Sequence, residues 1–65
     1  MLTYNGWLDK FPQFVAISEP QWIEMQIEAA TEMGSDPERW AGQTTYDIAQ
    51  GYLIGHLAAM AEASE

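Results

Sequence analysis

Few side chains in this sequence could carry chemistry, and His56 is the first to consider. It is the single histidine, and histidine is the residue whose ordinary titration lies nearest neutral pH. Its neighbours Leu53 and Leu57 favour a histidine whose ring packs on a helix and bonds at one nitrogen. Nucleophilic catalysis would need a nucleophile and an orienting acid. The chain has no Cys, and Tyr46 and Asp47 lie about three helical turns, ~15 Å, before His56. We therefore predict no catalytic residue and no enzyme.

A second group consists of Glu24, Glu28 and Glu32, which repeat every four residues. This spacing predicts an acidic line along one side of a helix that contains no Lys or Arg. The line is interpreted as a solvated face, as a docking surface for a basic partner, or as a wall beside DNA. Carboxylates on a helix could also bind a divalent ion, but no loop of oxygen ligands accompanies them. We expect no metal and no cofactor.

The three tryptophans, Trp7, Trp22 and Trp40, are many for 65 residues. Tryptophan fills cores, and it is also favoured at the hot spots of protein interfaces. A core this small has limited room for all three indoles. We expect them to anchor core or neighbour contacts, and together with the three glutamates they form the candidate partner interface.

Two long helices are predicted to carry these residues. Ser18, followed by Pro20 and Gln21, has the pattern of a helix N-cap with a reciprocal side-chain bond, and Gly34 is a typical helix end. This pattern predicts a helix over 19–33. Apolar residues recurring at three and four predict a second helix over about 45–63, starting at Thr44 or Thr45.

Two short helices are predicted near 3–11 and 37–40. Thr3 can cap the first, whose apolar residues at i, i+3, i+4 and i+7 share one face, and Pro12 ends it. Asp36 and Pro37 are a good N-cap and first residue for the second. No segment alternates as a strand would, so the sequence predicts an all-α bundle forming a single domain over residues 1–65.

The spacing of apolar residues also predicts which faces are buried. In the first long helix the expected inner stripe is Ile23, Ile27, Ala30 and Met33, widened by Trp22 and Met25. In the second long helix an apolar series recurs at three and four and predicts that the helix continues to about Ala63: Ile48, Ala49, Tyr52, Leu53, His56, Leu57 and Met60. Gly51 and Gly55, four apart, leave a smooth patch that another helix could approach closely.

Composition excludes several classes of protein. Ten Asp and Glu against two Lys and Arg give a formal charge of −8, so the chain should be repelled by nucleic acid and by anionic membranes. No apolar run predicts a membrane span or a signal peptide. Disulfides are impossible without Cys, and a core this small supplies only about 3–5 kcal/mol. Oligomerisation or docking is therefore expected.

The order of several short motifs resembles a known family. Phe11-Pro12-Gln13-Phe14-Val15, Ile17-Ser18 and a helix entered at Trp22-Ile23 are similar to the opening of small head–tail connector proteins of tailed bacteriophages. Trp40-Ala41-Gly42, Tyr46-Asp47-Ile48-Ala49 and Tyr52-Leu53-Ile54-Gly55-His56-Leu57 resemble later stretches of the same family. The similarity spans about residues 3–60.

The resemblance implies a structural virion protein with no catalytic residues. Such adaptors assemble as rings, often of about twelve copies, beneath the portal protein. They extend the DNA channel, let DNA pass without specific binding, and dock the next tail or head-closure component. The implied location is the head–tail junction of the virion, and the host cytoplasm during assembly.

An alternative is a small acidic module that mimics DNA and inhibits a nucleic-acid-binding protein. The charge of −8 favours it. A mimic should, however, spread carboxylates over much of its surface, and residues 48–61 contain none. Binding to a basic host enzyme that weakens with salt would support this alternative.

Overall fold

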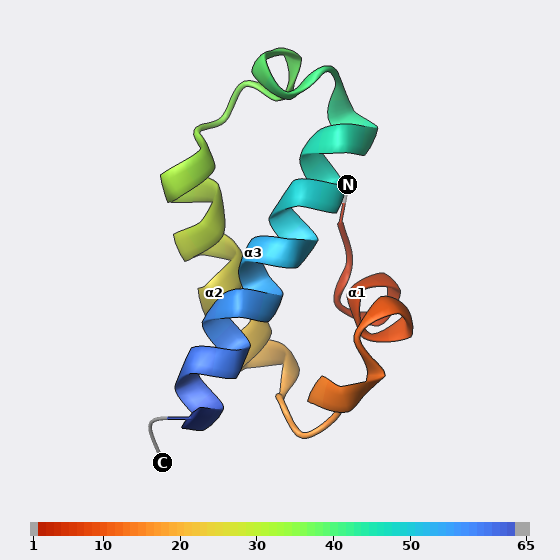
Figure 1. The fold of residues 1–65 in the computed structure, drawn as a ribbon, viewed down its shortest axis with the longest axis vertical. Helices are drawn as coiled ribbons and strands as arrows, with labels where there is room; N and C mark the ends of the chain where they lie inside the picture. The colour runs from red at the N-terminus through yellow and green to blue at the C-terminus, as the bar shows by residue number, and fades with distance from the viewer. Residues whose placement is uncertain (1, 64–65) are drawn as a thin grey trace.

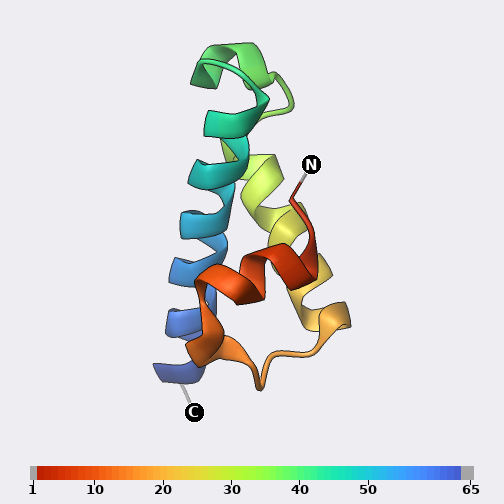
Figure 2. The ribbon, with the colours of Figure 1, turned by 90° about the vertical axis from the view of Figure 1, so that its right-hand side faces the viewer.

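The computed structural model describes residues 2–63, and the predicted all-α class is confirmed. The helices are α1 (Tyr4–Lys10), α2 (Glu19–Met33) and α3 (Gln43–Ala63), with 3-10 turns at Pro12–Phe14 and Pro37–Trp40. Figure 1 shows α2 and α3 as an antiparallel pair joined at the top by the second 3-10 turn. Figure 2 shows α1 lying across one side of this pair. The molecule is elongated, at 36 × 21 × 17 Å.

Helix α1 begins and ends at the residues that the sequence predicts. The side-chain oxygen of Thr3 accepts a hydrogen bond from the Gly6 amide at 3.1 Å, which satisfies one of the free donors of the first turn. Pro12 follows and restricts Phe11 to a non-helical conformation, so α1 ends at Lys10. The Tyr4 hydroxyl then donates to the Ile17 carbonyl and ties α1 to the connection before α2.

The bounds of α2 agree with the prediction at both ends. The Ser18 hydroxyl accepts from the Gln21 amide at 3.4 Å, and the Gln21 side chain accepts from the Ser18 amide at 3.0 Å. This reciprocal cap fixes the first turn. Gly34 ends the helix with φ of +86°, a conformation that residues with a side chain avoid.

The turn between α2 and α3 also follows the predicted signals. The Asp36 carboxylate accepts from the Glu38 amide at 3.1 Å and caps the short turn. Ala41 is left-handed, with φ of +64°. Helix α3 begins at Gln43, one or two residues before the predicted threonines, because the Gly42 carbonyl already accepts from the Tyr46 amide at 3.0 Å.

The predicted buried stripe of α2 is wrong, because the helix is rotated about its own axis relative to that prediction. Trp22 and Ala29 are buried, whereas Ile23 and Ile27 are exposed. The cause lies in α1, because the Tyr4 and Trp7 rings contact Trp22 at centroid separations of 5.9 and 6.4 Å and turn that face inward. Burying an indole removes more apolar area from water than burying an isoleucine does.

Helix α3 ends at Ala63 as predicted, but its recurring apolar series is not its buried face. The buried residues are Tyr46, Gln50, Gly51, Ile54, Gly55 and Ala58. Ile48, Tyr52, His56 and Met60 are exposed, and Ala49, Leu53 and Leu57 lie at the boundary. The expected close approach at the two glycines is present, since Trp7 lies over Gly51 and Phe11 over Gly55. Large side chains from α1 therefore meet small ones on α3.

Candidate docking surface

The three predicted tryptophans occupy different environments. Trp7 is 0% exposed and donates from Nε1 to the Gly51 carbonyl at 2.9 Å, and Trp22 is 3% exposed. Burial makes both unavailable to a partner in this fold, so they belong to the core rather than to the predicted interface. Trp40 is 36% exposed, and its Nε1 donates to the Met33 carbonyl at 3.2 Å. Only Trp40 among the three remains an interface candidate.

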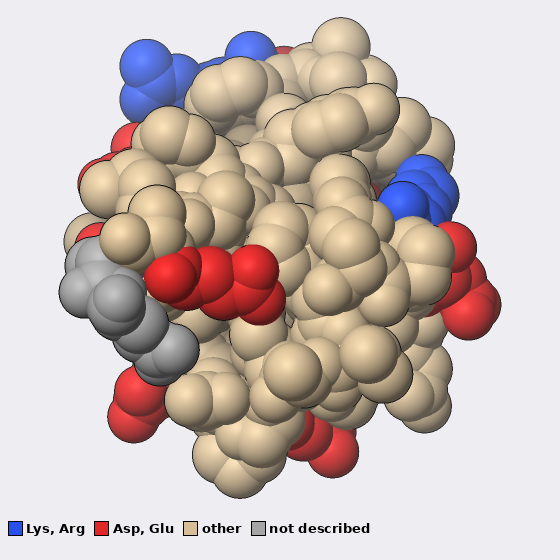
Figure 3. Space-filling model, turned by 60° about the horizontal axis from the view of Figure 1, so that its bottom comes forward, with Lys and Arg blue, Asp and Glu red and all other residues tan. Residues whose placement is uncertain are grey.

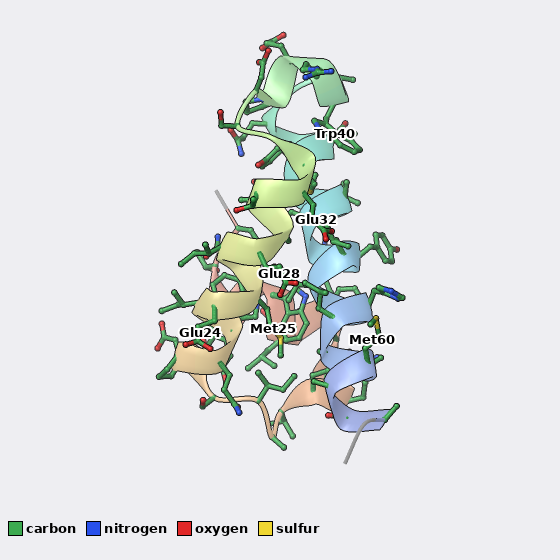
Figure 4. The ribbon with its side chains drawn as sticks, turned by 90° about the vertical axis from the view of Figure 1, so that its left-hand side faces the viewer. Glu24, Met25, Glu28, Glu32, Trp40 and Met60 are labelled. Atoms are coloured by element: carbon green, nitrogen blue, oxygen red, sulfur yellow. The ribbon has the colours of Figure 1, made fainter. Side chains whose placement is uncertain are left out.

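The predicted acidic line is present on α2. Glu24, Glu28 and Glu32 are all exposed, and within residues 2–63 no ion pair joins them to either basic side chain. Figure 4 shows Glu28 and Glu32 on the side of α2 next to α3, whereas Glu24 lies at the lower end of α2, on the side farther from α3. Arg39 lines a shallow depression together with Glu32 at the upper end. These three residues are called the acidic row below.

An apolar strip lies beside the acidic row. We define it as Met25 on α2 with Leu53, Leu57 and Met60 on α3. Met60 is exposed and the other three are half-buried. In Figure 4 Met25 lies between the two helices and Met60 lies on the far side of α3 from α2. The α2–α3 face thus has Met25, Leu53 and Leu57 at its centre, where they pack against the core. Met60 lies at its outer α3 edge, and Glu28 and Glu32 lie on its α2 side.

The outward side of α3 carries no charge over residues 48–61. At ~100° per residue, Ile48, Tyr52, His56 and Met60 share that side. Figure 3, which views the molecule from below, shows a mostly uncharged surface with separate carboxylates on it and basic side chains at the margins of the view. In a chain of formal charge −8, an uncharged surface of this length is distinctive.

Large hydrophobic side chains are exposed in unusual number. Seven are at least 36% exposed, namely Val15, Ile23, Ile27, Trp40, Ile48, Tyr52 and Met60. Eight hydrophobic residues are buried among residues 2–63. Scattered exposed apolar residues are normal, but contiguous ones mark sites of interaction.

A groove of about 620 Å³ lies between α1 and the first half of α3. Its apolar lining includes Trp7, Phe11 and Tyr52, and Lys10 and Asp47 also line it. Gly51, over which Trp7 packs, is also part of the lining. Its size is within the range of small-molecule sites, but its polar groups are few.

The described residues contain neither a cluster of metal ligands nor a membrane-spanning helix. Within residues 2–63 no group of three or more His, Asp and Glu residues is placed to hold a metal ion. His56 is exposed on α3 and is not packed as predicted. No helix in the described part of the chain is long and apolar enough to cross a bilayer.

Comparison of this chain with protein-family models, curated proteins and solved structures finds no match. Sequence analysis found the acidic row, and its placement of Met25 beside the buried stripe of α2 agrees with the packing of Met25 against the core. It did not predict that the outward side of α3 is exposed. The absence of charge from residues 48–61 was the available signal.

Proposed function

We propose that this chain is a structural assembly protein of the head–tail connector type. It would form a ring of about twelve copies under a portal protein, extend the DNA channel and dock tail components. It would act in the virion, and in the host cytoplasm during assembly, without catalysis or a cofactor. The ordered motifs quoted above suggest this family.

The observation that carries the proposal is the exposure of seven large hydrophobic side chains beside a core of eight hydrophobic residues. Burying such side chains against neighbours contributes about 25 cal/mol per Å² of apolar area. A chain with so small a core gains proportionally more from these contacts than a larger protein would. Five of these residues lie on two different helices, Ile23 and Ile27 on α2 and Ile48, Tyr52 and Met60 on α3, and a head-to-tail ring needs two unlike surfaces on each copy.

The charge distribution supports the channel role. A wall beside passing DNA should not attract phosphates, and carboxylates repel them. Ten acidic residues against two basic ones give the chain as a whole this property. The DNA-mimic alternative has less support, because α3 contributes a long surface free of carboxylates.

The oligomeric mass tests the proposal. Light scattering and electron microscopy of the concentrated protein should show one closed assembly, a multiple of the 7.3 kDa chain. Ile23→Ser together with Ile27→Ser should yield smaller species with unchanged helical content by circular dichroism, because both side chains are exposed. A protein that remains monomeric at millimolar concentration would contradict self-assembly.

A further inference from the structure

The α2–α3 face combines two features that constrain what could cover it. It carries the apolar strip, with Met25 between the two helices and Met60 at the outer edge of α3, and Glu28 and Glu32 of the acidic row lie on its α2 side. Methionine and leucine adapt to varied apolar surfaces, which suits a helix lying along them. Because these carboxylates lie on the α2 side, an occupant meets negative charge on one of its edges.

The spacing of the acidic row defines the chemistry of that edge. Glu24, Glu28 and Glu32 lie at intervals of four residues, or ~6 Å along α2. Lys or Arg residues repeating every four positions on another helix have the same ~6 Å spacing. Neither Lys10 nor Arg39 forms an ion pair with the row within the described residues.

A second copy of this chain does not complement the row. It has only two basic residues, Lys10 and Arg39, on different elements, and they cannot form such a series. Two copies approaching through this face would bring their acidic rows into the same region, and like charges oppose that approach. The occupant must therefore be a different protein with a basic edge.

We infer that the α2–α3 face docks a basic amphipathic helix of another protein. The apolar side of that helix contacts the apolar strip, and its Lys or Arg series faces Glu24, Glu28 and Glu32. The inference rests on the proposed docking role and specifies the chemistry of one partner. Self-association then uses other exposed residues, such as Ile23 and Ile27.

The test uses a designed 18-residue helix with a leucine stripe and Lys at every fourth position along one edge. Calorimetry should show binding that weakens with salt, and amide chemical shifts should change on the facing sides of α2 and α3. The same peptide with Glu in place of Lys should not bind. A third peptide of the first composition, scrambled to remove the leucine stripe, should also fail to bind.

Two sets of variants separate a specific site from diffuse attraction. Glu24→Gln, Glu28→Gln and Glu32→Gln together should weaken binding by about tenfold, since exposed ion pairs are individually weak. Asp9→Asn, Glu19→Gln and Glu38→Gln remove the same charge from other exposed positions and should change affinity by less than about twofold. Met60→Ser should weaken binding, and Val15→Ser, at another exposed apolar residue, should not.

Equal weakening by the two triple variants would overturn the inference, because it would show attraction to net charge alone. Binding of the acidic or scrambled peptide, or no binding of the basic peptide, would also overturn it. The ring proposal fails separately. A monomer that binds the basic peptide keeps this inference and loses the ring, whereas a ring that ignores the peptide keeps the ring alone.

Discussion

The indole nitrogens of the two buried tryptophans have different surroundings. Nε1 of Trp7 donates to the Gly51 carbonyl at 2.9 Å, whereas Nε1 of Trp22 is buried with no hydrogen-bond partner. A buried donor without a partner costs about 1–3 kcal/mol. Trp22 is retained in the core by its ring contacts with Tyr4 and Trp7, and these offset the unpaired donor.

This difference predicts unequal effects of the same substitution. Trp7→Phe should lower the free energy of unfolding by about 2–3 kcal/mol, because it removes a buried hydrogen bond and leaves a cavity. Trp22→Phe should cost about 1 kcal/mol or less, since losing the unpaired donor offsets the lost ring contacts. Urea unfolding followed by circular dichroism measures both, and equal losses would contradict this account.

At the scale of elements, the backbone geometry requires glycine at some positions and not at others. Gly34 ends α2 at φ of +86°, where a Cβ is strained even though no neighbour lies within 4 Å. Gly55 is inside α3, and a Cβ there would meet Phe11 at 3.5 Å, an ordinary van der Waals contact. Only the first of these two positions therefore demands glycine.

We predict opposite outcomes for alanine at these positions. Gly55→Ala should raise the free energy of unfolding by about 0.5–1 kcal/mol, because alanine costs less backbone entropy in a helix. Gly34→Ala should lower it by about 1 kcal/mol through left-handed strain. Thermal melts of the two variants check this, and a destabilised Gly55→Ala protein would mean that the α1 rings tolerate no added methyl.

The elements were predictable from sequence, whereas their rotations were not. Local signals such as the Ser18 cap, Pro12 and Gly34 fix where the helices begin and end. The buried faces depend on distant partners. On α2 both the Trp22–Met25–Ala29 series and the Ile23–Ile27 series have helical spacing, and contacts with α1 select the first. The spacing alone therefore assigns Ile23 and Ile27 to the core, although both are exposed.

At the scale of the whole molecule, negative charge is the dominant long-range force. The chain has eight more acidic than basic residues. Their negative charges repel one another within a molecule only 36 Å long. No ion pair relieves the acidic row among residues 2–63. Screening of these charges by added salt should therefore raise the free energy of unfolding.

Raising NaCl from 20 to 500 mM should increase Tm by about 5 °C, because the Debye length falls from about 20 Å to about 4 Å. Glu28→Lys should raise Tm at low salt, since it turns two repulsive i,i+4 pairs into attractive ones worth about 0.3–0.5 kcal/mol each. The same variant should respond less to salt. Scanning calorimetry checks both proteins, and a Tm independent of salt would contradict the role given to repulsion.

The packing of Trp7 over Gly51 also constrains how the chain folds during its synthesis. Helix α1 has seven residues, too few for a stable helix alone in water. Its indole hydrogen bond spans 44 positions of sequence. Helix α1 therefore lacks the carbonyl that pairs with its indole until Gly51 has been synthesised. Native burial of Trp7 consequently follows translation of Gly51, 44 positions after the indole itself.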